Sequence, residues 1–204
     1  MELLFALALF CAVTLFTPGP NNLMLMSSGL NFGFRRGVPH LLGVTLGFTV
    51  MVLIVGLGLG AVFAQWPLLY TGLKYAGAAY LLYLAWQIAV SVPPAAGVAT
   101  AGRPIGFLQA VAFQWVNPKA WVMAVGAIST YAAVAAFPLN VVVIAALFCL
   151  LGFASSGTWL GFGAGLQRVL KDHRAVRTFN IVMALLLVAS LYPIFADILP
   201  GSAP

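Results

Sequence analysis

The sequence TPGPNN, residues 17–22, interrupts the first apolar stretch of the chain and decides how that stretch folds. Leu3–Met26 carries no charged residue and is long enough, as a helix, to cross the roughly 30 Å hydrocarbon core of a bilayer. Pro18 and Pro20 remove two backbone donors and clash with preceding carbonyls, so we predict a broken helix. Unpaired backbone at membrane depth is tolerated where it lines a watery cavity, and the two asparagines that follow add polar groups there. This pattern favours a transporter-type substrate site, with a plain proline kink as the alternative.

Composition places nearly the whole chain in a membrane. Hydrophobic residues make up 63% of the 204 residues, charged residues make up 6%, and the mean hydropathy is +1.09. A soluble domain averages roughly 25% charged residues. The net charge of +6 does not predict nucleic-acid binding, because the basic residues do not cluster with aromatic residues on a polar segment. Cys11 and Cys149 lie in apolar runs without disulfide or zinc spacing, so we expect free thiols and no metal or other cofactor.

Six apolar segments are long enough to span a bilayer with some tilt. The predicted spans are residues 3–26, 38–63, 68–91, 106–129, 138–166 and 178–199. A flexible connection that begins at Pro93 divides them into halves of three, about 1–92 and 105–204. Halves with an odd number of spans must lie in opposite orientations if they share a fold, as inverted repeats do in many transporters. We therefore expect an all-α membrane protein, one transmembrane domain over residues 1–204, with its first and fourth helices broken.

Positive charge predicts how the spans are oriented. Seven of the nine Lys and Arg residues lie in the connections 27–37, 92–105 and 167–177, which all fall on one side. They are Arg35, Arg36, Arg103, Arg168, Lys171, Arg174 and Arg177. The positive-inside rule places these connections in the cytoplasm and both termini on the outer side. Only Lys74 lies near the opposite side.

Glycines spaced four residues apart predict where helices approach closely in lipid. The second predicted span carries Gly43 with Gly47 and Gly56 with Gly60, and the fifth carries Gly157, Gly161 and Gly165. We expect these to serve packing within the chain, although the strip in the fifth span could instead join two copies in a homodimer.

Few polar groups lie within the predicted spans. Lys119 is the only charge well inside one, and its cost at that depth predicts a position at a cavity or beside a partner. Asn180 and Ser155–Ser156 fit a polar lining and simple packing equally well, whereas His40 is expected at the solvated cytoplasmic end of its span. The candidate substrate site comprises Thr17, Pro18, Gly19, Pro20, Asn21, Asn22, Gln114, Asn117, Pro118 and Lys119.

The chain has too few acidic residues to predict a metal site or an active site. Glu2, Asp172 and Asp197 all lie near span ends or in a connection, which argues against a divalent-metal channel and an intramembrane aspartyl protease. No histidine or lysine lies near Ser155–Ser156 in the sequence, and there is no Walker-type phosphate loop. We therefore do not expect an enzyme. One ammonium, neutral amides and exposed helix ends suit a small carboxylate-bearing, amino-acid-like solute.

Several motifs then occur in a recognisable order. They are Thr17–Asn21, Gly33–Gly37, Gly43–Gly47, Lys74–Trp86, Gly106–Phe107 and Asn117–Ala120. Over nearly the whole chain they resemble the LysE/RhtB family of amino-acid exporters. Phe113–Asn117 and Asn180–Leu187, with Asn22 and Ser27–Ser28, resemble its cysteine and O-acetylserine exporter branch.

The resemblance implies a six-span bacterial inner-membrane protein that exports amino acids or derivatives by secondary transport. Small neutral amino acids are favoured over basic ones, because no buried acid is present to meet a second cation. The driving force stays open between the proton gradient, with Lys119 as a proton carrier, and the membrane potential. Lys119 could also reach an interface instead of the substrate. A non-transporting membrane subunit, for assembly or regulation, is the alternative function.

Overall fold

The computed structural model describes residues 1–59, 67–91, 103–170 and 172–192. Within these ranges the chain is helical and contains no β-strand, so the predicted all-α class is confirmed. The α-helices are α1 (Glu2–Phe16), α2 (Pro20–Phe32), α3 (Phe34–Ile54), α5 (Pro67–Ala89), α6 (Phe107–Val116), α7 (Pro118–Thr130), α8 (Leu139–Val169) and α9 (His173–Ala189). A π-helical turn η1 (Val55–Leu59) extends α3, and a 3₁₀ turn η2 (Ala132–Val134) follows α7.

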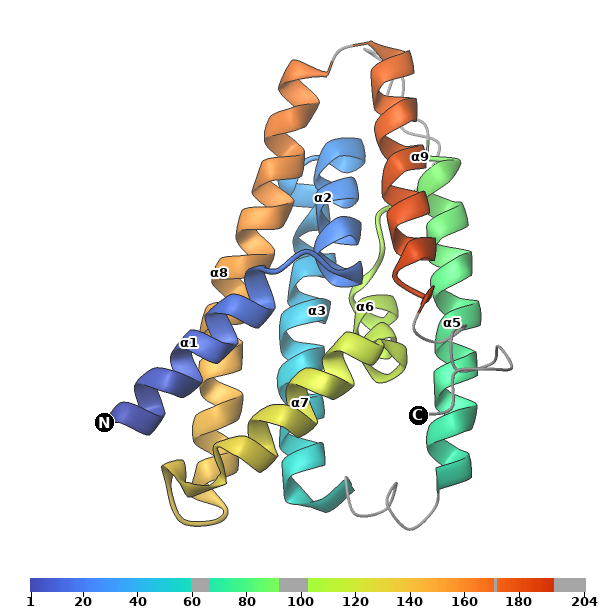
Figure 1. The fold of residues 1–204 in the computed structure, drawn as a ribbon. Helices are drawn as coiled ribbons and strands as arrows, with labels where there is room; N and C mark the ends of the chain where they lie inside the picture. Colours follow the sequence, from blue (N-terminus) through green and yellow to red (C-terminus); the bar gives the residue numbers. More distant parts are fainter. Residues whose placement is uncertain (60–66, 92–102, 171, 193–204) are drawn as a thin grey trace.

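Two groups of helices form the body of the molecule (Figure 1). The long helices α3 and α8 lie side by side with α2 packed against them, and α5 and α9 lie together beside α2 and α6. Two clusters of buried apolar side chains fill these interfaces, one mainly from α2, α5, α6 and α9 and the other from α1, α3, α7 and α8. The helices α1 and α7 run obliquely to the long axis. Helix α1 is followed end to end by α2, and α6 is followed end to end by α7, with a break at each junction.

The first break separates α1 from α2. The two helices are bent by 53° across Thr17–Gly19. Pro20 is the first residue of α2, a position at which its missing N–H leaves no hydrogen bond unmade. The preceding Gly19 has extended backbone, with φ −170° and ψ 178°. The broken first helix predicted from the two prolines is therefore present.

The second break separates α6 from α7 at Asn117. This residue has extended backbone angles, φ −85° and ψ 110°, and its side-chain oxygen accepts a hydrogen bond from the backbone N–H of Lys119 at 3.1 Å. Asn117 thus caps α7, and Pro118 follows it as the first helical residue, the usual place for proline. The predicted break in the fourth apolar segment is present as well.

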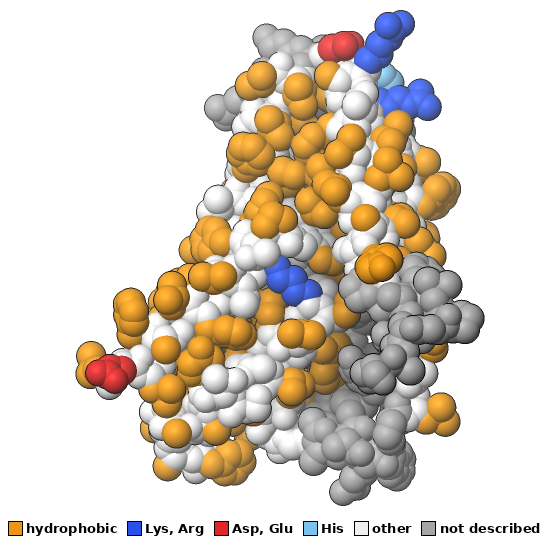
Figure 2. All heavy atoms as spheres, in the orientation of Figure 1, with side chains coloured by type: hydrophobic (Ala, Val, Ile, Leu, Met, Phe, Trp, Pro, Cys, Tyr) orange, Lys and Arg blue, Asp and Glu red, His pale blue; other side chains and the backbone are white. Residues whose placement is uncertain are grey.

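Two helical segments of the described chain are long and apolar enough to cross a membrane by themselves, Phe34–Gly58 and Leu139–Gln167. The bent pair α1–α2 makes a third if it crosses as one span. The surface fits such a setting, because hydrophobic side chains are spread over the face in Figure 2 and few charged side chains are visible on it. The chain therefore has the helices of a membrane protein, while the arrangement of six spans in two inverted halves stays a proposal.

The helix ends differ from the predicted span ends at two connections. Residues 27–37, expected as a loop, are helical except for Gly33, because α2 runs to Phe32 and α3 begins at Phe34. The polar side chains that suggested a loop are instead satisfied inside the protein. Asn31 donates to the backbone oxygen of Ser27 at 2.9 Å, for example. The last helix begins at His173 rather than near residue 178 and ends at Ala189, and the predicted end at 199 lies outside the described residues.

Glycines do bring helices together, but not at every predicted position. Gly43 and Gly47 pack against α6, where an added Cβ would lie 2.4 Å from the Phe107 oxygen and 2.9 Å from the Val111 Cα. On α8, however, the close contact is made by Gly163, which faces Met26 of α2. Among the described residues, nothing lies within 4 Å of a Cβ at Gly157 or Gly165, and one at Gly161 makes ordinary contact with Phe34 at 3.8 Å, so this strip is not where α8 is approached most closely. Gly60 lies outside the described residues. The three glycines lie on a different face of α8 from Gly163.

Candidate functional site

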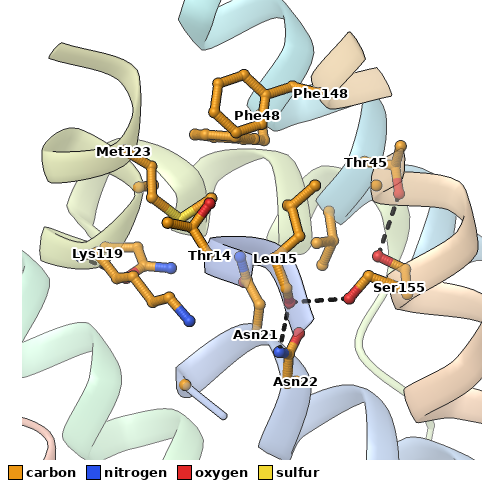
Figure 3. A pocket seen from close by; sticks show the side chains of 16 residues that line it. Thr14, Leu15, Asn21, Asn22, Thr45, Phe48, Lys119, Met123, Phe148 and Ser155 are labelled. Carbon is orange, nitrogen blue, oxygen red and sulfur yellow. Dashed lines mark hydrogen bonds between the residues drawn. The ribbon is translucent and has the colours of Figure 1, made fainter. Parts of the chain in front are cut away.

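A cavity lies where the two helix breaks meet (Figure 3). The cavity has a volume of about 40 Å³, about three times the roughly 10–15 Å³ that one water molecule needs. Parts of α1, α2, α3, α7 and α8 surround it. It is lined by Thr14, Leu15, Gly19, Asn21, Asn22, Val44, Thr45, Phe48, Asn117, Lys119, Ala120, Met123, Phe148, Gly152, Ser155 and Ser156.

Lys119 reaches from the second break to the first. Its Nζ donates a hydrogen bond to the backbone oxygen of Thr17 at 2.6 Å. The side chain passes directly over Gly19, since an added Cβ there would lie 2.9 Å from the Lys119 Cδ and 3.0 Å from its Nζ. Glycine at this position therefore makes room for the lysine, and the ammonium group lies between the end of α1 and the start of α2.

The backbone oxygens freed at the end of α1 are satisfied by side chains from other segments. Asn22 Nδ2 donates to the oxygens of Leu15 and Thr17 at 2.9 and 3.0 Å. Ser155 of α8 donates to the Leu15 oxygen at 2.8 Å, as the dashed lines in Figure 3 show. Asn22 and Ser155 thus stabilise the break itself, as expected for irregular backbone at membrane depth.

A pair of carboxamides joins the start of α2 to α6. Asn21 Nδ2 donates to Gln114 Oε1 at 2.8 Å, and Gln114 Nε2 donates back to Asn21 Oδ1 at 3.1 Å. Gln114 is fully buried and also donates to the Ala110 oxygen at 2.8 Å. This reciprocal pair holds α2 and α6 in a fixed relation at the edge of the cavity.

Half of the predicted site residues line the cavity, and the others support it. The lining ones are Gly19, Asn21, Asn22, Asn117 and Lys119. Thr17 contributes its backbone oxygen, Gln114 orients Asn21, and Pro18, Pro20 and Pro118 form the breaks without lining the cavity. The structure thus brings the two predicted breaks, which are about a hundred residues apart in sequence, to one place.

Some lining residues carried no signal in the sequence. Thr45 Oγ1 donates to Ser156 Oγ at 3.2 Å, which links α3 to α8 beside the cavity. Phe48 and Phe148 form an edge-to-face pair with ring centres 5.1 Å apart and close one side. Threonine and phenylalanine are so common in apolar helices that only the packing of α3 against α8 identifies them.

His40 departs most from expectation. It was predicted at a solvated helix end, but it is fully buried, and its Nδ1 lies 2.9 Å from the Ser28 Oγ. Its Nε2 has no hydrogen-bond partner among the described residues. The prediction failed because α2 continues six residues beyond its expected end, so that Ser28 faces α3 rather than solvent.

The cavity has a single positive charge. Lys119 is the one charged side chain among the described residues that line it, and no aspartate or glutamate is among them. The N-terminus of α2 beside it has no side-chain cap, so the backbone N–H groups of Asn21 and Asn22, which follow Pro20, remain available to an anion. In the described part of the chain, no group of three or more His, Cys, Asp or Glu side chains could hold a metal ion.

Comparisons with known proteins identify the family of this chain. The sequence model of the LysE type translocator family matches residues 12–190. The chain is 35% identical to a cysteine/O-acetylserine efflux protein of Salmonella paratyphi A over 195 residues, which cover 95% of this chain and 97% of the relative. It is 36% identical to a protein of the same name in Escherichia coli O1:K1, with the same coverage. No solved structure shows a significant match. The chain therefore belongs to the LysE family and is a membrane translocator rather than an enzyme.

Proposed function

We propose that this protein exports small neutral amino acids or their derivatives from the cytoplasm across the bacterial inner membrane. The observation that carries the proposal is the position of Lys119, whose ammonium group lies at the cavity beside the uncapped start of α2. A cation and the N-terminus of a helix both favour a carboxylate. The names of the curated relatives, which refer to efflux of cysteine and O-acetylserine, support a substrate of this class.

The rest of the lining fits the remainder of such a substrate. Hydroxyl groups of Ser155, Ser156 and Thr45 can accept hydrogen bonds from a substrate ammonium group. Phe48 and Phe148 offer an apolar wall to a short side chain. A basic amino acid would bring a second positive charge, for which the described lining has no carboxylate. The cavity is small, with a volume of about 40 Å³, so we propose that the surrounding helices move apart when a substrate binds.

We propose further that the chain is one domain of six spans in two inverted halves, about 1–92 and 105–204. The two proline-containing breaks support this arrangement, since each lies in the first helical segment of its half and both border one cavity. Such a carrier works by secondary transport, driven by the proton gradient or by the membrane potential. A homodimer would use α8 around Gly157 and Gly165, because no described residue lies within 4 Å of a Cβ at either position.

The orientation has both termini in the periplasm. The described parts of the three basic connections support it, because they lie toward one end of the molecule, which we call the basic end. Gly33, next to Arg35–Arg36, lies beside Gln167 near the end of α8, and Arg103 lines the same cleft as Phe32. Figure 2 shows Lys and Arg side chains gathered where α8 meets α9. The positive-inside rule assigns this end to the cytoplasm.

Efflux measurements test the proposed function. Cells that carry or lack the protein are loaded with dipeptides, and the release of a panel of amino acids that includes cysteine, serine and O-acetylserine is compared. We expect faster release of small neutral amino acids, and the Lys119→Gln variant should abolish it at unchanged abundance in the membrane. Arg35→Gln is the matched control, because Arg35 is exposed at the basic end. Equal release with and without the protein for every solute would favour a non-transporting subunit.

Cysteine labelling tests the orientation. Glu2→Cys and Arg174→Cys are made separately in a protein without Cys11 and Cys149, since both positions are exposed and lie near opposite ends. A membrane-impermeant maleimide applied to intact spheroplasts should label Glu2→Cys only. Labelling of Arg174→Cys alone would reverse the topology.

A further inference from the structure

A second cleft lies toward the basic end, away from the central cavity. It has a volume of about 660 Å³, within the roughly 300–1,000 Å³ typical of small-molecule sites. The second half of α2, the end of α5 and the segment Arg103–Gly106 that leads into α6 form its walls.

The chemistry of this cleft resembles that of the central cavity. Among the described residues that line it, Arg103 is the only charged one, and it is exposed and makes no hydrogen bond or ion pair with a described residue. Neutral polar groups from three elements surround it, namely Ser27, Ser28, Gln87, Ser91 and Gln109. A single guanidinium among hydroxyls and carboxamides suits a carboxylate, which it can bind with two parallel hydrogen bonds.

Hydrogen bonds to neighbouring helices fix the polar residues that line the cleft. Asn31 and Asn180 form a reciprocal carboxamide pair at 2.8 and 2.9 Å, and Asn180 also donates to the backbone oxygen of Ser91 at 3.1 Å. Ser28 is fixed by the fully buried His40, at 2.9 Å. These contacts connect α2, α3, α5 and α9, so the hydroxyl groups are already positioned before any ligand arrives.

Two helices connect the cleft with the central cavity. Along α2, Asn21–Asn22 line the cavity and Ser27–Ser28 line the cleft, and along α6 Gln109 lines the cleft just before the Asn117 break. Phe113 and Gln114, both fully buried, lie between Gln109 and Asn117 in the sequence of this segment.

We propose that this cleft is a second, cytoplasm-facing substrate site, in which Arg103 binds the carboxylate of the amino acid before it reaches the central cavity. The inference rests on the proposed function and its orientation for the identity of the ligand. The hydroxyls of Ser27 and Ser28 then accept hydrogen bonds from the substrate ammonium group, and the aromatic ring of Trp86 borders the side chain.

Transport measured from each side separates this site from the central one. In proteoliposomes of known orientation, Arg103→Gln should raise the apparent KM for serine offered on the cytoplasmic side about fivefold to tenfold, the effect of losing one partly solvated charge-assisted hydrogen bond. The apparent KM from the periplasmic side and the maximal rate should change less than about twofold. Arg103→Lys should retain most of the affinity. Arg174→Gln, an exposed change at the same end but outside the cleft, is the control for a general loss of surface charge.

A binding measurement does not depend on transport. With Ser91→Cys in a protein lacking Cys11 and Cys149, serine should slow the reaction of the new cysteine with maleimide, and serinamide, which has no carboxylate, should not. The protection should persist with Lys119→Gln and disappear with Arg103→Gln. The inference would be overturned if Arg103→Gln left the KM from the cytoplasmic side unchanged, or if Arg174→Gln raised that KM equally. It would also be overturned if serine still protected the cysteine from maleimide in the Arg103→Gln variant. The proposed function is judged separately, by efflux from cells.

Discussion

Replacing Gly163 with alanine should force α8 away from α2. A Cβ at this position would lie 2.0 Å from the backbone oxygen of Met26 and 2.8 Å from its carbonyl carbon. On the facing helix, a Cβ at Gly29 would lie 2.2 Å from the Leu160 oxygen, so the contact is close from both sides. Real Cβ atoms essentially never come within 3.0 Å of another atom. Since the obstructing atoms are backbone and cannot rotate away, the helices have to separate by about 1 Å.

The expected loss of stability follows from this geometry. Overpacking a well-packed interface costs about 1–3 kcal/mol. We expect the upper end of this range, because the helix that moves also carries Asn22 and the Asn31–Asn180 pair on its other faces. For a chain of about 200 residues, 3 kcal/mol lowers the midpoint of thermal unfolding by roughly 6–12 °C.

Gly157→Ala on the same helix is the matched control. Nothing lies within 4 Å of a Cβ at this position, so alanine should leave the midpoint unchanged or raise it through its better helix propensity. The two variants are compared with the parent protein by the thermal unfolding of purified protein in one detergent. If Gly163→Ala unfolds within about 2 °C of Gly157→Ala, α2 and α8 do not approach as closely as described.

Two further predictions concern the site. Asn21→Ala and Gln114→Ala should each lower the stability of the protein and reduce efflux. The double variant should be no less stable than the Gln114→Ala variant, which corresponds to a coupling energy of about 1–2 kcal/mol in a double-mutant cycle measured by thermal unfolding. Additive losses of stability would mean that the two carboxamides do not bond to each other. Gly19→Ala should preserve folding, because its Cβ meets only the flexible end of Lys119, but should displace the ammonium group and lower efflux at normal abundance. Gly72→Ala, which has nothing nearby, is its control, and equal efflux by the two variants would contradict the placement of Lys119.

The helix breaks could be predicted from the sequence because their cause is local. Proline lacks an N–H and fixes φ wherever it occurs, so Pro20 and Pro118 mark the first residues of α2 and α7 without reference to the rest of the fold. The predicted position of Lys119 at membrane depth likewise called for a polar neighbourhood. Its position at the cavity agrees with that requirement, while its role in binding stays a prediction.

The remaining features depend on which helix faces which, and the sequence gives little information about that. Helices in a membrane are apolar on every side, so the pattern of hydrophobic residues does not separate the face against lipid from the face against protein. That is why the glycine strip at Gly157 was assigned to packing while Gly163 was missed. The pair Asn31–Asn180 joins residues 149 positions apart, and the burial of His40 depends on the unforeseen length of α2.

The hydrogen bond between Lys119 and the Thr17 oxygen has a consequence for how tightly any solute is held. The ammonium group has three N–H donors and this bond uses one of them, so a carboxylate can bind the others while the Thr17 oxygen, which also accepts from Asn22, stays in place. The bond therefore holds the lysine side chain in position before a solute arrives, and less side-chain freedom is lost when the solute binds.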